Sequence, residues 1–426
     1  MMATTAANGT HKTLWMINQY AITPDLPGGT RHYDFGCELA RHGWDVTVFA
    51  SDVNLALREH VRLKPGQLWC EEIVDGVRFV WVRAALYKKN NWRRVWNMLS
   101  FVLNFLRVAR LLQLTPDVVV GSSPHLFAPV GAWIVARRHG ARFVLELRDL
   151  WPQALIDLTG SSEKRLSMRL MRIIEAFLYR KAHQIVVLAT GSIRYLVNRG
   201  VAESKILYIP NGVHMRHFQS SDASGSTQER LHARDGFGFR RYTIVYTGAH
   251  GTANSLSTIL KAAKLVAESR DRVEFVLVGD GPSKLELVRE SESLGLTNVR
   301  FMDPVPKTAV SRLLDAADAA VITLRSAEAF SYAISPNKLF DYMAAGKPVL
   351  CAVEGDMANL VTQSGAGMAV PPENPEALAE AVLRLVQLPD HERQAMGHRG
   401  RELVQRDFSR EALAIQLSQA MERNFR

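Results

Sequence analysis

The stretch "SPNKLFDYMAAGKPVLCAV", from Ser335 to Val353, places a helix start, a charged helix face and an apolar strand one after another. Ser335 is a good N-cap and Pro336 a good first helical residue. Lys338 and Asp341 are three residues apart, so they share one face of the predicted helix. The run "PVLCAV" that follows is apolar on both faces, which indicates an interior strand of a parallel sheet.

The same alternation of apolar strands and amphipathic helices extends through the chain in both directions. Strands rich in Val and Ile, bounded by helix-length segments, indicate parallel sheets covered by helices. Helices are expected near residues 30–42, 126–139 and 163–182. Strands are expected at 13–17, 45–50, 77–82, 117–123, 142–149, 184–189, 243–248, 273–281, 299–303, 319–324 and 348–353.

A chain of 426 residues is too long for one hydrophobic core, and the strand pattern restarts after residue 240. The sequence therefore predicts an α/β protein of two doubly wound, Rossmann-like domains that face a cleft, with ligands beyond the carboxyl ends of the strands. The domains are expected at residues 1–208 and 209–395. Helices at 396–426 complete the chain, and their return to the first domain is left open.

Composition narrows the class of protein. The chain is 47% hydrophobic and 22% charged, which is typical of a globular protein, and its net charge of +10 favours an anionic partner. Three cysteines show no metal or redox spacing, consistent with a reducing compartment. We find no apolar signal core at the start and no run long enough to span a bilayer.

The helix that begins the quoted stretch is a candidate diphosphate site. A helix N-terminus offers free N–H groups to phosphate, and Lys338 would add a full positive charge there. Asp341, one turn further, would accept hydrogen bonds from both hydroxyls of a ribose. The alternative is a simple surface ion pair between the two side chains, which contributes little.

Two glycine-containing loops after predicted strands strengthen the nucleotide hypothesis. These are "YTGAHG" (246–251) and "VGDGPSK" (278–284). Glycine permits close approach of the backbone to phosphate, although either loop alone is also compatible with an ordinary turn. The candidate donor-binding residues in them are Gly248, His250, Gly251, Gly279 and Asp280.

The N-terminal half has three comparable loops. "PGG" (27–29) precedes a helix, "GSSPHLFAP" (121–129) contains His125, and "LELRDLWP" (145–152) clusters charged residues at a strand end. Each has a plainer alternative: a glycine turn, a buried histidine, and an Arg–Asp pair. The candidates in these loops and the helix start are Gly28, Gly29, Arg31, His32, His125, Arg148 and Asp149.

Together, "SPNKLFDYMAAGKPVL", "VGDGPSK", "YIPNGV" and "PGGTRHYDFGCELARHGWDVTVFAS" resemble family 4 glycosyltransferases of the GT-B fold. The branch resembled assembles bacterial O-antigen and capsule repeats and includes N-acetyl-fucosamine transferases. The resemblance implies a nucleotide-sugar donor, usually a UDP-sugar, and transfer with retention of configuration. It implies that Asp341 holds the ribose and that His125 lies near the donor sugar. Ala333 replaces a glutamate that contacts the sugar in the family, for which backbone groups or Glu328 could substitute.

The residue roles follow from this resemblance. We expect His125, Lys338 and Asp149 at the reaction centre, and Arg31, His32 and Arg148 at the acceptor. Gly28 and Gly29 join the donor-binding set. The departing phosphate oxygen could itself take the acceptor proton, so no protein base is required. The sequence contains no Asp-x-Asp, so we expect catalysis without a metal or cofactor, with Lys338 and helix dipoles stabilising the leaving diphosphate.

A basic apolar segment predicts membrane contact. Residues 76–116 contain no acidic side chain, and a helix at 92–112 has a narrow polar stripe. Excess apolar surface with tryptophans and flanking arginines suits a membrane interface, whereas a helix sandwiched between the sheet and a neighbour is the alternative. The expected membrane residues are Trp92, Arg93, Arg94, Trp96, Phe101 and Phe105.

The resemblance implies an acceptor saccharide linked to a lipid diphosphate at the cytoplasmic face, and the basic apolar segment agrees with it. Together they predict a cytoplasmic enzyme that is peripheral on the inner face of the membrane. The main alternative is a UDP-sugar 2-epimerase or another nucleotide-sugar enzyme of the same fold without a lipid acceptor. A non-enzymatic sugar- or nucleic-acid-binding protein is less favoured, because the aromatic residues do not form a stacking platform. A dinucleotide dehydrogenase is least favoured, because the first turn lacks G-x-G-x-x-G.

Overall fold

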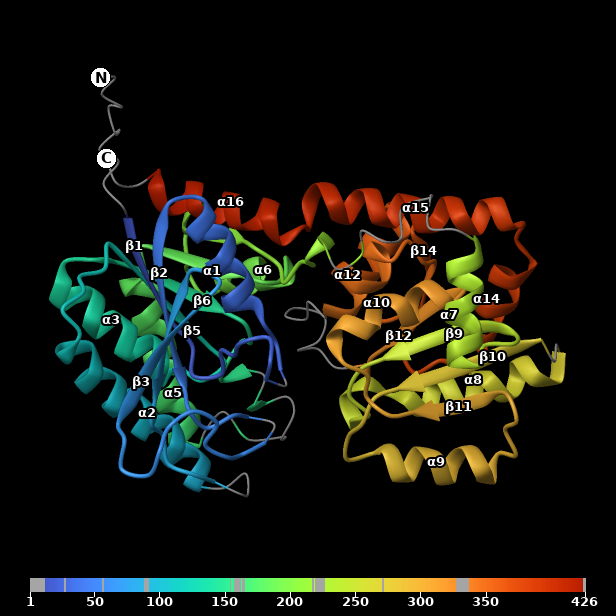
Figure 1. Cartoon of the computed structure of the whole chain (residues 1–426), viewed down its shortest axis with the longest axis horizontal. Helices are drawn as coiled ribbons and strands as arrows, with labels where there is room; N and C mark the ends of the chain where they lie inside the picture. Colours follow the sequence, from blue (N-terminus) through green and yellow to red (C-terminus); the bar gives the residue numbers. More distant parts are fainter. Residues whose placement is uncertain are drawn as a thin grey trace, which may run out of the picture. The chain divides into compact units, whose positions relative to one another are not determined.

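The computed structural model describes residues 12–26, 28–55, 57–87, 92–153, 155–156, 162, 165–216, 218, 227–269, 272–326 and 337–423. The chain divides into two compact units (Figure 1). The N-terminal unit comprises residues 1–188, 192–209 and 414–426. The C-terminal unit comprises residues 189–191 and 210–413.

The N-terminal unit is built on an eight-stranded sheet with the order β3-β4-β2-β1-β5-β6-β7-β8. All neighbouring strands are parallel except β3 and β4, which form an antiparallel edge. The central strands are almost completely buried, as expected for a sheet covered on both faces. The strands are β1 (Lys12–Ile17), β2 (Trp44–Ser51), β3 (Trp69–Val74), β4 (Val77–Val82), β5 (Val118–Ser122), β6 (Arg142–Leu147), β7 (Gln184–Val187) and β8 (Ile206–Tyr208).

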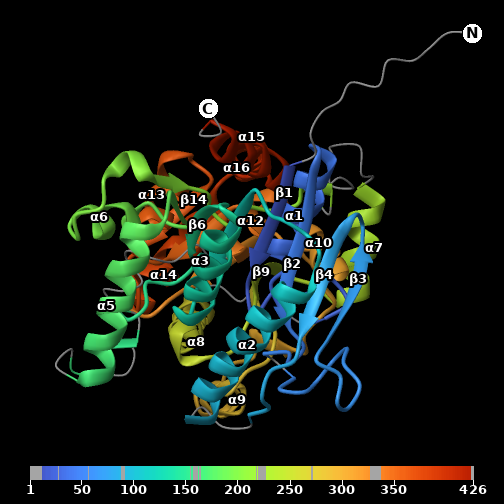
Figure 2. The same ribbon diagram turned by 90° about the vertical axis from the view of Figure 1, so that its left-hand side faces the viewer.

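The helices of this unit connect successive strands and cover the sheet. Helix α3 contacts both α2 and α5, and the three lie side by side over one face (Figure 2). Helix α1 packs against β2 and β4. The helices are α1 (Arg31–Arg41), α2 (Trp92–Leu111), α3 (Phe127–His139), α5 (Leu166–Lys181) and α6 (Gly191–Val197), with a short 3₁₀ turn η1 (Glu203–Lys205).

The C-terminal unit is built on a six-stranded sheet with the order β11-β10-β9-β12-β13-β14, and all of its pairs are parallel. Starting at β9, the strand order runs outward in one direction and then in the other. This leaves a switch point between β9 and β12, where open α/β sheets bind ligands. The strands are β9 (Tyr242–Thr247), β10 (Val273–Val278), β11 (Val299–Met302), β12 (Ala319–Thr323), β13 (Val349–Ala352) and β14 (Gly367–Val370).

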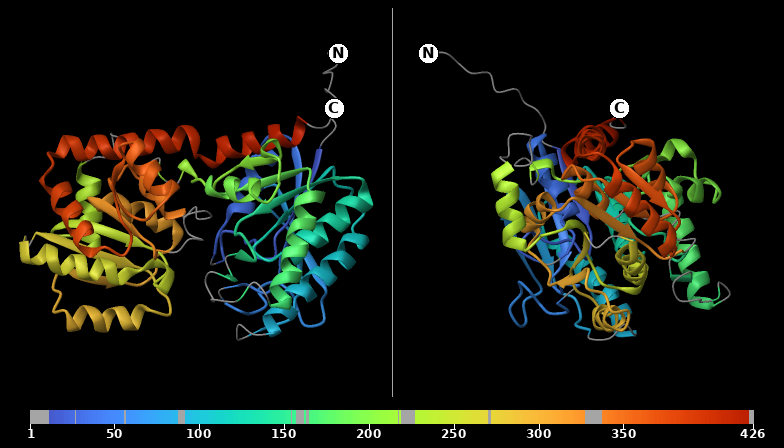
Figure 3. Two further views of the ribbon diagram at one scale, coloured as in Figure 1. Left: turned by 180° about the vertical axis from the view of Figure 1, so that it is seen from behind. Right: turned by 90° about the vertical axis from the view of Figure 1, so that its right-hand side faces the viewer.

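The helices of the C-terminal unit pack in contacting pairs. Helix α8 contacts α14, α7 contacts α10, and α12 contacts α15 (Figures 1 and 3). The helices are α7 (Thr227–Phe237), η3 (Thr252–Asn254), α8 (Leu256–Ser269), α9 (Lys284–Ser293), α10 (Lys307–Ala316), α12 (Asn337–Ala344), α13 (Asp356–Gln363), α14 (Pro375–Gln387), α15 (Asp390–Asp407) and α16 (Arg410–Glu422). Residues of α16 from 414 onward belong to the N-terminal unit.

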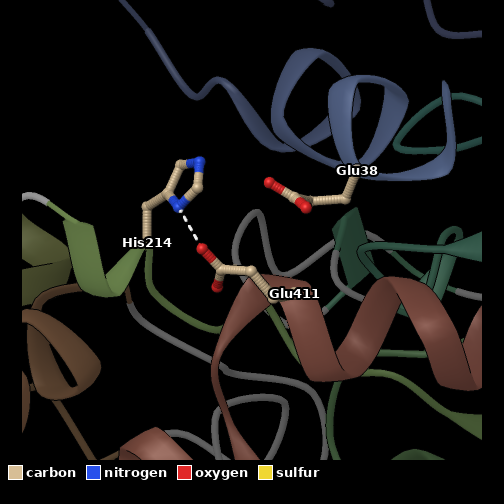
Figure 4. A group of neighbouring side chains, drawn as sticks. All are labelled: Glu38, His214 and Glu411. Carbon is tan, nitrogen blue, oxygen red and sulfur yellow. Dashed lines mark ion pairs between the residues drawn. The ribbon is translucent and has the colours of Figure 1, made fainter. Parts of the chain in front are cut away.

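The C-terminal unit joins its first and last segments directly. The amide of Val213 donates to Phe408 O at 3.0 Å, and the amide of Arg410 donates to Val213 O at 3.0 Å. His214 Nδ1 lies 2.8 Å from Glu411 Oε1 (Figure 4). Burial alone would raise the pKa of Glu411, but the bond from His214 lowers it below its ordinary value. The segments at which the chain enters and leaves this unit are therefore hydrogen-bonded to each other.

The predicted fold class, an α/β protein of two doubly wound domains, is confirmed. The sequence pattern missed three strands. Strand β3 is an antiparallel edge strand whose burial alternates, and β8 and β14 are short and only half-buried. Strand β3 lacks a continuous apolar run, whereas β8 and β14 have apolar runs of only three and four residues.

Candidate active site

Lys338 lies in the first turn of α12, beside the loop that follows β9. Its ammonium donates hydrogen bonds to Tyr246 Oη and to Asn254 Oδ1, each at 2.9 Å. It also lies 4.4 Å from the centroid of the Tyr246 ring, within the range of cation–π attraction. The groups that fix the ammonium in place are therefore neutral.

The charge of Lys338 is not neutralised by a carboxylate. Within the part of the chain that the structure describes, it forms no ion pair, so the surface pair with Asp341 does not form. Burial lowers the pKa of Lys338 to about 7. An anionic ligand would raise that pKa again, because it favours the charged form. Asp341 lies half-buried on the same helix, and its contact with a ribose stays a prediction.

The two glycine loops of this unit are joined to each other. The amide of Gly248 donates to Val278 O and the amide of His250 donates to Asp280 O, both at 2.9 Å. Gly279 has φ of 148°, and a Cβ there would lie 1.9 Å from Gly248 O. No side chain fits at that approach, so Gly279 is required by the packing of the two loops. A Cβ on Gly248 would lie 3.2 Å from Lys338 Nζ, so its backbone borders the ammonium.

The remaining predicted donor residues occupy different environments. His250 is completely buried, with its ring 6.1 Å from both Tyr246 and Phe301, and neither ring nitrogen has a hydrogen-bond partner. Burial lowers the pKa of His250, which keeps the ring neutral. Asp280 is exposed, and Gly251 borders open space. Their contacts with a donor stay predictions, while Glu328 and Ala333 lie outside the described residues.

In the N-terminal unit, the predicted acceptor residues Arg31 and His32 form a buried network around Glu146. Arg31 Nε donates to Glu146 Oε1 at 2.9 Å. Ser122 Oγ donates to Glu146 Oε2 at 2.6 Å, and His32 Nε2 lies 2.9 Å from the same oxygen. Arg31 also donates to Ile209 O at 2.9 Å. The network thus joins the start of α1 to the ends of β5 and β6 and to the last residue before the C-terminal unit.

Electrostatics fix the protonation states of this network. Burial would raise the pKa of Glu146, but Arg31, His32 and Arg148 lower it well below its ordinary value. Burial lowers the pKa of His32, opposed by Glu146, so we describe His32 as neutral. Arg31 and His32 are each 4% exposed, and their donors are used inside the protein. The contact of these two residues with an acceptor stays a prediction.

His125 belongs to a second polar chain in the same unit. Its Nε2 lies 2.7 Å from Gln19 Oε1, and Gln19 Nε2 donates to Asn97 Oδ1 of α2 at 2.6 Å. Burial and the nearby Arg94 lower the pKa of His125 to about 3, so the ring is neutral. A pocket beside this chain is lined in part by Gln19, Tyr20 and Trp81.

Arg148 and Asp149 follow β6 on a loop held by Ser123. The amide of Arg148 donates to Ser123 Oγ at 2.8 Å, and the same hydroxyl lies 3.3 Å from the amide of Asp149. The buried Nε of Arg148 has no hydrogen-bond partner, and a Cβ built on Gly29 would lie 4.0 Å from its guanidinium. Partial burial raises the pKa of Asp149, opposed by Arg148, although the residue is exposed. The plain ion pair between them is not formed among the described residues.

The structure corrects the predicted membrane face of α2. Phe101 and Phe105 are completely buried, and Phe105 packs edge-on against Phe49 of β2 at 5.0 Å. The predicted polar stripe also turns inward, since Asn97 Nδ2 donates to Ala85 O at 2.6 Å. The error arose because these polar residues bond a neighbouring loop instead of water. Two of the other predicted residues, Trp92 and Trp96, are 69% and 50% exposed, while Arg93 is exposed and Arg94 half-buried.

Comparisons with known proteins identify the class of protein. Residues 28–212 match the family described as "Glycosyl transferase 4-like domain", and residues 241–388 match "Glycosyl transferases group 1". The chain therefore carries these two domains in succession and is a glycosyltransferase of the GT-B fold.

Relatives and solved structures add detail. A protein of Escherichia coli K12 described as a colanic acid biosynthesis glycosyl transferase, WcaI, is 26% identical over 355 residues, covering 80% of this chain and 84% of that protein. The E. coli O-antigen chain mannosyltransferase C is 25% identical, covering 55% of this chain and 60% of that protein. Anabaena HepE, solved with UDP and glucose, superposes with a TM-score of 0.70 at 15% identity, covering 96% and 99% of the two chains.

Several residues of both sites escaped sequence reasoning. Tyr246 and Asn254 hold Lys338, and Gln19 holds His125, but none of these was singled out. Gln19 follows β1 directly, and polar residues just beyond the carboxyl end of a parallel strand are the available signal. Tyr246 lies within an apolar strand and is indistinguishable there from a core residue.

Proposed function

We propose that this glycosyltransferase moves a sugar from a UDP-sugar to a saccharide linked to a lipid diphosphate, with retention of configuration, in the assembly of a bacterial surface polysaccharide. An N-acetylated amino sugar is the proposed donor sugar. The colanic acid and O-antigen functions in the names of the relatives support the polysaccharide assignment. The complexes of HepE with UDP and with UDP-glucose support the choice of nucleotide.

The observation that carries the proposal is the ammonium of Lys338. It is held beside a glycine loop by two neutral oxygens and is left without a carboxylate among the described residues. Breaking a sugar–phosphate bond puts negative charge on the leaving diphosphate, and a pre-positioned cation stabilises that charge most where water is excluded. With no Asp-x-Asp in the sequence, we propose that Lys338 acts without a divalent metal.

On the acceptor side, Arg148 is the proposed contact for the lipid-linked diphosphate. Its guanidinium is half-buried beside Gly29 and forms no ion pair among the described residues. Guanidinium groups suit phosphate oxygens because their donors match them in pairs. Asp149, exposed on the next residue, is the proposed group that orients the acceptor hydroxyl, and His125 is the proposed contact for a sugar hydroxyl.

Membrane association completes the proposed function. The described helices include none that is long and apolar enough to cross a bilayer. Helix α2 exposes Trp92, Val95 and Trp96 beside the exposed Arg93. Aromatic and basic side chains on one exposed helix face suit the interface of an anionic membrane, so we propose peripheral attachment to its cytoplasmic face.

The test combines a binding screen with turnover. UDP-, GDP- and dTDP-sugars are compared by thermal shift, and sugars that stabilise the protein are incubated with a synthetic lipid-diphosphate saccharide. We expect UDP-sugars to bind and transfer to require the lipid-linked acceptor, with turnover intact in EDTA. Conversion of the UDP-sugar without any acceptor would instead favour the epimerase alternative, and loss of turnover in EDTA would refute the metal-free mechanism.

A further inference from the structure

We propose that the layer formed by α2, α3 and α5 is a docking face for an anionic lipid bilayer, and that α5 forms one edge of it. The proposed function assigns only α2 to the membrane, and this inference adds α3 and α5. It rests on the proposed function in one respect, namely that the protein works at a membrane. Its evidence comes from α3 and α5, which the reasoning about α2 did not use.

Helix α5 carries an exposed apolar stripe. Leu166, Leu170 and Ile173 are 83%, 55% and 65% exposed. Spacings of four and three residues place them on one side of the helix. The other side packs inward through Met168 and Leu178, which are 9% and 0% exposed. The helix therefore has two apolar sides, one packed into the protein and one exposed.

Helix α3 lies between the exposed apolar residues of α5 and those of α2 and contacts both helices. Phe177 of α5 packs edge-on against Trp133 of α3, with ring centroids 4.8 Å apart. Ile134 beside it is 37% exposed, and α3 contacts α2, where Leu103 is 50% exposed. Figure 2 shows the three helices next to one another on this side of the N-terminal unit. Exposed apolar side chains gathered on neighbouring helices in this way favour a partner for that surface.

The charges on the same helices have one sign. The three helices contain 20, 13 and 16 residues, and their single acidic residue, Glu175, is 2% exposed. Its carboxylate accepts hydrogen bonds from Arg172 and Tyr179, so it is used inside the protein. The whole chain has 42 acidic residues in 426, which makes this layer unusually poor in them. The exposed cations are Arg93, Arg107, Arg110, Arg137, Arg138, Arg169, Arg180 and Lys181.

This combination fits a bilayer better than other occupants. Leucine and isoleucine stripes offer no stacking platform for nucleic acid bases. A second copy of the chain would place like charges opposite one another, which destabilises a symmetric interface. Anionic headgroups complement the cations, while the apolar side chains insert at the boundary with the acyl chains.

The experiment is vesicle cosedimentation of the full chain, with phosphatidylcholine alone or mixed with phosphatidylglycerol. The test variant is Leu166→Glu combined with Leu170→Glu. The matched control is Leu231→Glu combined with Leu285→Glu, since those leucines are 56% and 75% exposed on the C-terminal unit. We expect the test variant to bind the anionic vesicles about tenfold or more weakly, and the control to bind like wild type. Binding of wild type should weaken as salt is added.

A Trp92→Glu and Trp96→Glu variant separates this inference from the proposed function. If that variant loses binding while the α5 variant binds like wild type, docking is confined to α2, so the inference is overturned and the proposed function stands. If both variants bind like wild type, the inference and the proposed membrane attachment both fail. UDP binding is measured for every variant as a check of folding. If the α5 double variant no longer binds UDP, the milder variant Ile173→Gln is tested in its place, and weaker vesicle binding is again expected.

Discussion

The two units treat their buried charges in opposite ways. In the N-terminal unit, the carboxylate of Glu146 is surrounded by Arg31, His32 and Ser122, whose donors Arg31 Nε and Ser122 Oγ are bonded to it. In the C-terminal unit, the bonds of the Lys338 ammonium within the described residues go to the neutral oxygens of Tyr246 and Asn254. A charge satisfied inside the protein stabilises the fold, whereas one positioned but not neutralised favours an anionic ligand.

The largest expected effect comes from removing the carboxylate of Glu146, which pairs with Arg31. Glu146→Ala leaves the buried Arg31 without its counter-charge, and such a loss costs about 3–5 kcal/mol of unfolding free energy. Urea unfolding, followed by a probe in each unit, would measure it. If Glu146→Ala instead abolished transfer at unchanged stability, Glu146 would belong to the reaction centre and the contrast between the units would fail.

Removing the unsatisfied charge should act on catalysis. Lys338→Met is expected to lower kcat by roughly 10²–10³-fold, because a donor aimed at developing charge is lost. Stability should hold or rise slightly, since an ammonium with a pKa lowered to about 7 by burial is itself destabilising. Initial rates and thermal unfolding of the same preparation test both halves of this prediction. A large fall in melting temperature without loss of kcat would mark Lys338 as structural.

The pH dependence of nucleotide binding sharpens the comparison. Burial lowers the pKa of Lys338 to about 7, so the free protein loses this proton as the pH rises through 7. A bound diphosphate raises the pKa, and binding therefore takes up a proton. Above pH 7 the affinity for UDP should fall by up to about tenfold per pH unit. Calorimetric titrations measure this, and Lys338→Arg is the control, because a guanidinium keeps its charge and should give a flat profile.

The smallest effect is expected from the groups that hold the ammonium. Tyr246→Phe removes one hydrogen bond to Lys338 Nζ and keeps the aromatic ring beneath it. We expect kcat/KM for the nucleotide-sugar to fall by an amount that corresponds to about 0.5–1.5 kcal/mol of transition-state stabilisation. Steady-state kinetics at saturating acceptor would detect it. An effect as large as that of Lys338→Met would mean that Tyr246 itself contacts the reacting groups.

Sequence patterns were most informative where one physical signal dominated. Continuous apolar runs located the parallel strands, and the helix start at Lys338 located the positive charge. The failures come from partners distant in sequence. Asn97 and Ser100 of α2 pattern as a solvent-facing stripe, yet they bond the loop around Ala85, and Phe101 turns to the core with them. Likewise, Arg31 and His32 resemble ligand-binding residues in the sequence. In the structure both contact the carboxylate of Glu146, which lies more than a hundred residues away along the chain.

The hydrogen bonds of Val213 with Phe408 and Arg410 bring together the two ends of residues 210–413, which form the C-terminal unit with the short segment 189–191. Residues 210–413 can be expressed as a single gene segment that keeps these hydrogen bonds, to test whether it folds and binds a nucleotide in isolation. The remaining N-terminal unit is split, because residues 414–426 belong to it. An N-terminal unit truncated at residue 209 lacks Ser418, whose hydroxyl accepts a hydrogen bond from the indole N–H of Trp44. Residues 414–426 must therefore be joined to it by a linker if this contact is to be kept.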